Sequence, residues 1–484
     1  MTSRALVLAA AVAAASLGIV FHPHPKPGPA LRDFEAYYAA GATWRYHGDA
    51  YGRDVWHVEK DIPGVVATHD ELLPFVGPPF GLPLWEALAR LPWGAASFVW
   101  GSVVVLAVVT LALCSLWLAG GPIEALDIAS VLVFAATFGP LLSGVALGQV
   151  AVVSCAAIAA SALLLRPRLI FGATAAILVA ALQPNLALVL AARIDGRRAW
   201  IAVCFAATVV AAGSFLALSG TSGFPHYLEV LRDHAAAERF IAIQTTPAAV
   251  ARALGASAGL AGSLALGLAL AVVALLCAQF ISRRYDPNAR LALASAALPL
   301  ALPFAHEHDL AIAFFPAILA LRRAHGAAWV VAACAALLVG VDWLGLAQRP
   351  GAVMQPALLA LAGALALIAL ARDRLRPYHF APLGIAVAVA LAGLLAATRP
   401  LATWPYGLPA GFHAAGTVPA AVVWHAEQIL SGVATLDPAS GVLRLCSLAG
   451  CALLWLVASV VLAQPAGARQ QRETPPQLRV LRSG

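Results

Sequence analysis

The sequence predicts an all-α fold: a polytopic bundle of membrane helices with about 12 spans, one broken half-helix hairpin and short interfacial helices in its outer loops. Three observations support this prediction. Hydrophobic residues make up 62% of the 484 residues, charged residues make up 11%, and the mean hydropathy is +0.86, whereas soluble domains contain about 25% charged residues. Apolar runs of about 20 residues, long enough to cross a bilayer, recur along most of the chain. Arginines gather in short clusters between these runs, as in loops that set membrane orientation.

The predicted spans follow the apolar runs. They are 5–21, 95–119, 126–143, 147–165, 198–218, 257–281, 290–304, 308–321, 326–345, 354–371, 381–397 and 443–463. The first of them could instead be a secretory signal, because it contains an Ala-x-Ala motif. The apolar run continues to residue 21 without a polar break, so we favour an uncleaved span.

The stretch 170–192 is predicted to enter the membrane and return rather than cross it. Its centre is Gln183-Pro184, and a proline removes a helix hydrogen-bond donor and clashes one turn back. A full crossing would invert the arginine clusters that follow, whereas a hairpin keeps every cluster on the cytoplasmic side. Irregular backbone at membrane depth is tolerated only inside protein or along a cavity, so the hairpin predicts a cavity.

This topology gives one transmembrane domain over residues 1–463 and a tail, 464–484, predicted to be disordered and cytoplasmic. Three long connections face outward: 22–94, 219–256 and 398–442. Within the first, 33–47 and 84–90 are predicted to form short helices at the membrane surface. The net charge of +7 comes almost wholly from orienting arginines, so no nucleic-acid partner is indicated. The seven Cys lie in apolar runs, as small core residues do.

Asp33 is the first candidate functional residue. It follows the first predicted span and lies among aromatic residues in LRDFEAYYAAG. A carboxylate there can act as a general base toward a hydroxyl if burial and its neighbours hold it ready. The same residue can instead be the N-cap of a short helix, and the sequence leaves both roles open.

A second candidate site is the stretch LPFAHEHDLAIAFFP, residues 302–316. Four ionisable residues, His306 to Asp309, interrupt an apolar run. Because a charge in the membrane costs about 3 kcal/mol or more, such residues usually face a wet cavity; a short exposed turn outside the membrane is the alternative. The stretch lacks the three or four spaced ligands that a zinc site needs, so neither a metal nor another cofactor is predicted.

The second outer loop carries candidates for binding phosphate. Arg232 and Arg239 lie where polar residues recur at nearly helical spacing, and a guanidinium can hold a phosphate through two parallel hydrogen bonds. A solvated loop helix is the alternative. Two amides, Gln149 at the start of a predicted span and Gln183 at the hairpin break, can satisfy backbone groups or contact a ligand.

In the order of these motifs, the sequence resembles the bacterial polyprenol-phosphate-mannose-dependent mannosyltransferases of the membrane GT-C superfamily. The resemblance covers roughly residues 30–320. Each motif is short, and their order and topology carry the resemblance. The motifs are Asp33-Phe34 with Tyr37-Tyr38, Gly48 to Tyr51, Pro78-Pro79, Gly148-Gln149, Gly172 through Gln183-Pro184, and Pro303 to Asp309.

The resemblance implies a GT-C-like fold and an inverting transfer of a hexose, mannose, from a polyprenyl-phosphate donor to a hydroxyl of a glycolipid or glycan acceptor. It implies that Asp33 is the general base and that no cofactor takes part. It also implies a multi-pass protein among the lipids of the bacterial cytoplasmic (inner) membrane, with its active site facing the periplasm. The substrate-binding residues that we expect are His308, His306, Arg232, Arg239, Tyr37, Gln149 and Gln183.

Two other functions stay open. A transporter or flippase of lipid-linked sugars would spread polar residues through its spans, whereas here they cluster in the outer loops. An O-antigen ligase or polymerase would favour one dominant large loop late in the chain, whereas the loop richest in polar residues here is the first.

Overall fold

The structure, a computed structural model, describes residues 3–21, 28–165, 169–220, 223–282, 284–348, 353–371, 375–398 and 400–463, so the tail expected to be disordered lies outside the described residues. Every regular element in these ranges is a helix. The α-helices are α1 Ser3–Val20, α2 Phe34–Arg45, α3 Trp56–Glu59, α4 Leu82–Ala89, α5 Trp93–Ala119, α6 Ala125–Ala135, α7 Gly139–Leu147, α8 Val150–Leu164, α9 Ile170–Ala180, α10 Pro184–Ala187, α11 Arg197–Ala217, α12 Gly223–Glu238, α13 Pro247–Ala253, α14 Ala258–Ile281, α15 Pro287–Ala297, α16 Phe314–Arg323, α17 Gly326–Gly340, α18 Trp343–Gln348, α19 Met354–Leu370, α20 Leu383–Ala396, α21 Ala420–Leu430 and α22 Pro438–Val461. The 3-10 helices are η1 Arg53–Val55, η2 Pro79–Gly81, η3 Leu188–Arg193, η4 Leu298–Leu300, η5 Glu307–Ala313 and η6 Pro377–Phe380.

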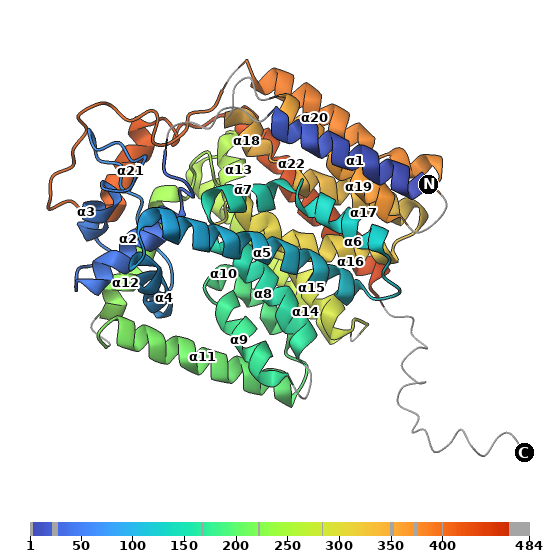
Figure 1. Ribbon diagram of the computed structural model, residues 1–484, viewed down its shortest axis with the longest axis horizontal. Helices are drawn as coiled ribbons and strands as arrows, with labels where there is room; N and C mark the ends of the chain where they lie inside the picture. Colours follow the sequence, from blue (N-terminus) through green and yellow to red (C-terminus); the bar gives the residue numbers. More distant parts are fainter. Residues whose placement is uncertain are drawn as a thin grey trace, which may run out of the picture.

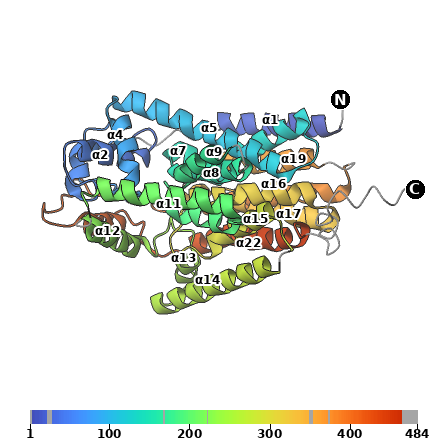
Figure 2. The ribbon, with the colours of Figure 1, turned by 90° about the horizontal axis from the view of Figure 1, so that it is seen from below.

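Five helices of the three long connections gather at one end of the bundle. These are α2, α3 and α4 from the first connection, α12 from the second and α21 from the third (Figure 1). The N-terminus lies at the opposite end, and a view turned by 90° again places α2, α4 and α12 far from it (Figure 2). We call the end that carries these five helices the loop end. The helices predicted at 33–47 and 84–90 are present as α2 and α4.

Seven helical stretches of the described part are long and apolar enough to cross a membrane: Ser3–Val20, Trp93–Ala119, Arg197–Ala217, Ala258–Ile281, Gly326–Gln348, Pro377–Ala396 and Pro438–Val461. The pair α6 and α7, bent by 63°, makes an eighth if it counts as one span. Three shorter apolar helices, α8, α9 and α19, pack among them. The predicted all-helical polytopic membrane fold is confirmed, although fewer helices than the predicted 12 or so reach full span length.

Two of the predicted spans, 290–304 and 308–321, are interrupted. α15 ends at Ala297 and continues as the 3-10 turn η4, and a second 3-10 helix, η5, precedes α16. Pro299 and Pro303 lie in this stretch and cannot donate helix hydrogen bonds. The irregular backbone is buried, since Glu307, His308 and Asp309 are only 7%, 5% and 2% exposed. The acidic and histidine residues therefore lie inside the protein, not in an exposed turn.

The expected break at Gln183-Pro184 is present. α9 ends at Ala180, and the chain continues as the short helix α10 and then as η3. α11 reaches the loop end at Ala217, whose carbonyl accepts a hydrogen bond from the Trp44 indole (3.2 Å). Because its 21 residues are about 31 Å long, α11 starts well away from the loop end. The segment before it therefore returns to the side from which α9 started, as a hairpin does.

A cluster of ion pairs joins α1, α6 and α16 at the end of the bundle opposite to the loop end. Arg4 at the start of α1 contacts the Asp127 carboxylate of α6 (2.5 Å), and Arg322 at the end of α16 contacts its other oxygen (2.7 Å). The side chains of Asp127 and Arg322 are each 1% exposed. These two arginines therefore lie on one side of the bundle, as the predicted topology requires.

The turn between α7 and α8 comes very close to the start of α2. Gly148 in this turn has a left-handed backbone (φ +72°). A Cβ atom at this position would lie 2.9 Å from the Cβ of Leu31 and 3.0 Å from that of Phe34. Both the backbone conformation and the close approach require glycine. The turn thereby places Gln149 beside Asp33.

The third connection packs against the first. The Asp70 N–H donates to the Phe412 carbonyl (2.7 Å), and the Asp70 carboxylate accepts from the Ala414 N–H (2.8 Å). The Glu427 carboxylate on α21 accepts from the Leu72 N–H (2.9 Å). Segment 400–437, for which the sequence indicated no role, thus holds the first connection in place at the loop end.

Candidate active site

Asp33 occupies the N-cap position of α2 but does not cap the helix. Its backbone is helical (φ −80°, ψ −20°), and its carboxylate makes no capping hydrogen bond. Its own N–H donates to the Leu147 carbonyl at the end of α7 (2.9 Å). The carboxylate instead accepts a hydrogen bond from Nε2 of Gln149. Asp33 thus lies at the position of an N-cap residue, but its side chain does not cap the helix.

Tyr37 fixes the amide that contacts Asp33. Its hydroxyl donates to Oε1 of Gln149 (3.2 Å). Its ring stacks on Trp85 with the centroids 4.8 Å apart and meets Phe75 edge-on at 5.9 Å. These aromatic contacts hold the phenol in place. Because its hydroxyl donates to Oε1 of Gln149, the NH₂ group of the same amide faces Asp33.

A second polar group comes from the buried segment before η5. The Asp309 carboxylate accepts from the His306 N–H (3.0 Å) and from Nε2 of Gln183 (3.2 Å). The rings of His306 and His308 lie 5.4 Å apart between centroids. The hairpin break at Gln183 therefore contacts the segment 306–309, beside which the sequence predicts a cavity.

Glu238, the last residue of α12, organises this second group. Its Oε2 lies 3.0 Å from Nε2 of His306, and it accepts a hydrogen bond from Nε2 of Gln244 (3.2 Å). Its Oε1 accepts from the Trp424 indole on α21 (2.7 Å). The Glu238 side chain is 3% exposed. Residues from the second and third connections and from the bundle thus meet at one buried carboxylate.

The ionisable groups change one another's pKa. Burial alone would raise the pKa of Glu238, but His234 and His306 hold it at about 2. Burial alone would lower the pKa of His306, but the Glu238 carboxylate holds it above its usual value. Burial raises the pKa of Asp33, against the opposing effects of the Gln149 hydrogen bond and of His306. Asp33 and His306 are therefore close enough for their charges to interact.

The cation next to Asp33 is already engaged. Arg32 contacts Glu35 (3.1 Å) and forms an ion pair with Glu71, and its guanidinium lies 4.5 Å from the centre of a Trp404 ring. Burial raises the pKa of Glu35 to about 8. Because carboxylates already hold Arg32, we do not assign it to a substrate phosphate.

Comparison with known proteins adds the chemistry. Residues 75–303 match the family model of glycosyltransferase family 87. The matched stretch covers just under half of the chain. Together with the apolar helix bundle, the match indicates a membrane glycosyltransferase. No curated protein and no solved structure matches the chain significantly.

The stretch similar to family 87 contains part of the site. Gln149, Gln183 and Glu238 lie within it, whereas Asp33 precedes it and His306 follows it. The assignments of Asp33 and His306 therefore depend on the geometry and on the motif resemblance rather than on the family-87 match.

The structure brings most of the predicted site residues together. One group joins the first outer loop to the start of α8, and the other joins the hairpin break to the histidine segment. The first group is Asp33, Tyr37 and Gln149, and the second is Gln183, His306 and His308. Their roles in binding substrate stay predictions.

The two predicted phosphate-binding arginines lie apart from these groups. The Arg232 side chain is 71% exposed and pairs with Asp233 (2.8 Å) and Glu229 (3.6 Å) on its own helix. Arg239 is exposed, and its guanidinium lies over the Phe240 ring. Among the described residues, no contact joins either arginine to the two polar groups. The exposure of both arginines fits the alternative given above, a loop helix whose charges face solvent.

Two residues of the site, Glu238 and Trp424, were not among the residues predicted from the sequence. Glu238 lies four residues after His234, and this spacing places two side chains on one face of a helix. That spacing was the available signal. No local sequence pattern pointed to Trp424, because it contacts Glu238 across 186 residues of chain.

Proposed function

We propose that this membrane glycosyltransferase transfers a hexose, mannose, from a polyprenyl-phosphate donor to a hydroxyl of a glycolipid or glycan acceptor. The reaction inverts the anomeric carbon, and Asp33 is the general base. The family-87 match supports sugar transfer over transport of a lipid-linked sugar. The donor, the sugar and the stereochemistry are supported by the motif resemblance to the GT-C mannosyltransferases.

One observation carries the proposal: the orientation of the Asp33 carboxylate. It does not cap α2, it is held by Gln149, and it interacts electrostatically with His306. A carboxylate that only stabilised the helix would bond its free N–H groups. Because burial raises its pKa, the Asp33 carboxylate is also a stronger base than an exposed aspartate.

The proposed reaction needs a single carboxylate. Asp33 accepts the proton of the acceptor hydroxyl while the hydroxyl oxygen attacks the anomeric carbon of the donor sugar. The new C–O bond forms on the face opposite to the phosphate. The bond from the anomeric carbon to the phosphate oxygen breaks, and the polyprenyl phosphate leaves with the electron pair. Direct attack requires no covalent sugar–enzyme intermediate, so no second carboxylate is needed as a nucleophile.

The leaving phosphate needs positive charge or hydrogen-bond donors as its own charge develops. His306 can supply them, because Glu238 holds its pKa above the usual value. His308 lies next to it. We assign these two histidines to the phosphate side of the site and Asp33 to the acceptor side.

The loop end is proposed to face the periplasm. Arg4 and Arg322 meet at the opposite end of the bundle, and Arg323 pairs with Asp286 at the start of α15 (3.8 Å). Arginine-rich helix ends face the cytoplasm. The proposed base, on the connection between α1 and α5, then lies outside the cytoplasm near the lipid headgroups.

The proposal is tested with purified protein and synthetic polyprenyl-phosphate mannose that carries a labelled sugar. We expect transfer of the label to a mannoside acceptor, with the anomeric configuration of the product opposite to that of the donor, as determined by NMR. A nucleotide-activated mannose serves as the control donor and should support no transfer. Absence of transfer from every polyprenyl-phosphate sugar would contradict the proposal.

Gln149→Leu should lower kcat/KM at acidic pH by about ten-fold or more. The Gln149 hydrogen bond lowers the pKa of Asp33, so its loss raises that pKa further and moves the acidic limb of the pH profile to higher pH. Hydrogen bonds to charged groups contribute about 1.5–3 kcal/mol. The measurement is kcat/KM between pH 4 and 8, roughly the range in which carboxylic acids and histidines titrate. An acidic limb at its wild-type position would refute this role of Gln149.

A further inference from the structure

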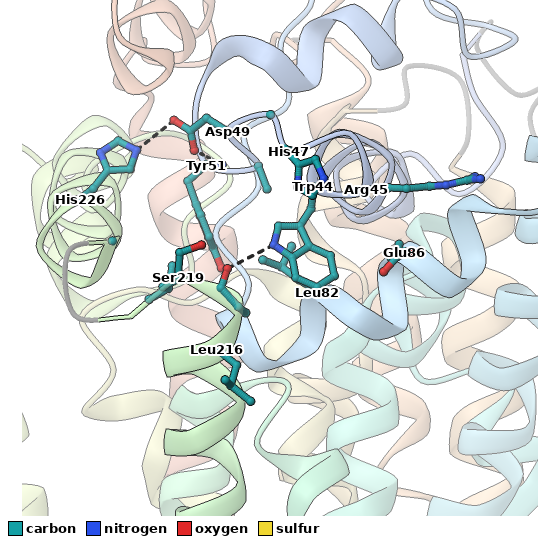
Figure 3. A pocket seen from close by; sticks show the side chains of 15 residues that line it. Trp44, Arg45, His47, Asp49, Tyr51, Leu82, Glu86, Leu216, Ser219 and His226 are labelled. Atoms are coloured by element: carbon teal, nitrogen blue, oxygen red, sulfur yellow. Dashed lines mark hydrogen bonds and ion pairs between the residues drawn. The ribbon is translucent and has the colours of Figure 1, made fainter.

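An open pocket of about 460 Å³ lies at the loop end, at the opposite end of α2 from Asp33. Its volume is in the range of small-molecule sites, about 300–1,000 Å³. The turn after α2, helix α4 and the junction of α11 with α12 form its walls (Figure 3). The proposed reaction does not use this pocket. Its polar and aromatic lining includes Trp44, His47, Asp49, Glu86, Ser219 and His226.

Polar side chains join two separate parts of the chain at this pocket. Oδ2 of Asp49 lies 3.0 Å from Nε2 of His226, and the two side chains are 45% and 50% exposed. The Trp44 indole N–H donates to the Ala217 carbonyl (3.2 Å), which fixes the ring at the junction. Figure 3 shows the Asp49–His226 pair on one side of Trp44 and Glu86 on the other. The lining thus combines an aromatic ring with hydrogen-bond donors and acceptors.

Strained backbone gathers at the same place. Within the described ranges, three non-glycine residues have a left-handed backbone: Leu31, His47 and Ser219, with φ of +57°, +61° and +56°. His47 and Ser219 line the pocket, and Leu31 lies two residues before Asp33. Such conformations cost about 1–3 kcal/mol and cluster at functional sites. Left-handed backbone is thus found both in the wall of the pocket and in the turn just before the proposed base.

We propose that the pocket is a second carbohydrate subsite, which binds a neutral hexose unit of an extended acceptor glycan away from the hydroxyl that reacts. The assignment of the bound glycan as the acceptor rests on the proposed function. The apolar face of a sugar ring packs on Trp44, and its hydroxyls bond Asp49, Glu86 and His226. Arg45 also lines the pocket and Glu86 pairs with Arg90 (2.6 Å), so the lining carries both signs of charge and offers donors and acceptors to the hydroxyls of a neutral sugar. Among the described residues, no three His, Cys, Asp or Glu side chains are placed to hold a metal ion, so a cation is not favoured.

The position of the pocket defines the class of acceptor. Eleven helical steps of about 1.5 Å separate Asp33 from Trp44 along α2, so the two sites lie about 17 Å apart. A single hexose cannot reach both sites, whereas an oligosaccharide can. Contacts so far from the reacting atoms contribute equally to the ground state and the transition state. They therefore lower KM for long acceptors without raising kcat.

The test uses free α-linked mannotriose and the purified full-length protein, with binding followed by saturation-transfer NMR and calorimetry. Wild type should bind the trisaccharide, and the double variant Asp49→Asn, His226→Ala should bind it at least about five-fold more weakly. Both side chains are about half exposed, so the variant keeps its fold. Glu229→Gln, an exposed change one turn further along α12, is the matched control and should bind as wild type does. Failure of wild type to bind, or equal binding by the double variant, would overturn the proposal, as would phosphate binding that depends on the same residues.

Transfer kinetics separate this inference from the proposed function. The double variant should raise KM at least about five-fold for an oligosaccharide acceptor, with kcat and the KM of a simple alkyl mannoside unchanged. Asp33→Asn should still bind mannotriose as wild type does. If mannotriose binding depends on Asp49 but no polyprenyl-phosphate sugar is used, the subsite stands and the proposed function is wrong. If transfer occurs with wild-type kinetics in the double variant, the subsite alone is wrong.

Discussion

We expect Asp33→Asn to lower kcat for hexose transfer about 10²- to 10⁴-fold, the usual contribution of a general base. Asparagine has the size of aspartate and can accept the same hydrogen bond from Gln149, but it cannot take up the proton of the acceptor hydroxyl. The fold should therefore persist while the chemical step is lost. Initial rates with labelled polyprenyl-phosphate mannose measure the loss, and the unfolding temperature of each protein measures the fold.

Asp61→Asn is the matched control for this change. Asp61 lies in the same outer loop as Asp33, and its side chain is exposed. The control removes one carboxylate from the loop without touching the candidate site, so it should keep wild-type kcat. Retention of more than about one-tenth of wild-type kcat by a folded Asp33→Asn protein would be incompatible with a general base at this position.

The pH profile tests the same assignment by a second route. Because burial raises the pKa of Asp33, wild-type kcat/KM should fall at a higher pH than it would with an exposed aspartate. A base must be ionised, so activity is present above this raised pKa and is lost as the pH falls through it. The residual activity of Asp33→Asn should lack this acidic limb.

The role of Asp33 illustrates what local sequence can and cannot predict. The sequence placed a short helix at 33–47 because its polar and aromatic pattern is local, and α2 is that helix. Whether the Asp33 carboxylate caps the helix or points away from it depends on Gln149, which lies 116 residues away in the chain. A contact over that separation leaves no trace in the spacing of either motif. The sequence alone therefore leaves both roles of Asp33 open.

Contacts between distant parts of the chain also explain why the sequence did not predict Glu238 as part of the candidate site. Burial decides whether a carboxylate near a histidine is a solvated loop charge or a strong electrostatic partner. Glu238 ends a loop helix that also carries exposed charges, and contacts with Trp424 of α21, His306 and Gln244 enclose it. Arg232 lies on that helix and Arg239 directly follows it, and both side chains are exposed. The charge pattern alone could not distinguish the buried side of α12 from the exposed one.

The bundle itself was easier to predict, since apolar runs and arginine clusters are properties of single segments. The predicted spans failed where packing interrupts a helix. The run 290–321 is apolar enough for two spans, yet its centre is irregular and buried. His306 and His308 of the second group occupy this interruption, because irregular backbone is tolerated where protein surrounds it.

Glu238→Gln is expected to reduce the free energy of unfolding by about 3 kcal/mol, the cost of removing one partner from a buried ion pair. Glutamine keeps the shape and can still accept from Trp424, but it removes the carboxylate that contacts His306 directly. Detergent unfolding followed by tryptophan fluorescence measures the change. Glu229→Gln on the exposed face of α12 should change the free energy by less than about 0.5 kcal/mol.

The dependence on pH shows whether the lost stability comes from this pair. The pKa of Glu238 is lowered from 4.5 to about 2, so the stabilisation from its charge is fully present above about pH 4.5 and is lost as the pH falls toward 2. The pKa of His306 is raised from 6.5, so the stabilisation from its charge is fully present below pH 6.5 and is lost as the pH rises through the raised value. The difference between wild type and Glu238→Gln should therefore be largest between pH 4.5 and 6.5.

Catalysis should respond at the other end of the pH range. Without the Glu238 charge, less opposes the effect of burial on His306, so its pKa is lower than in wild type and the histidine loses its proton at a lower pH. If protonated His306 stabilises the leaving phosphate, the basic limb of kcat/KM must then move to lower pH in Glu238→Gln, whereas a purely structural role would reduce stability and leave the limb in place. A variant that is destabilised but keeps the wild-type basic limb would thus assign Glu238 to the fold and remove His306 from the phosphate side of the site.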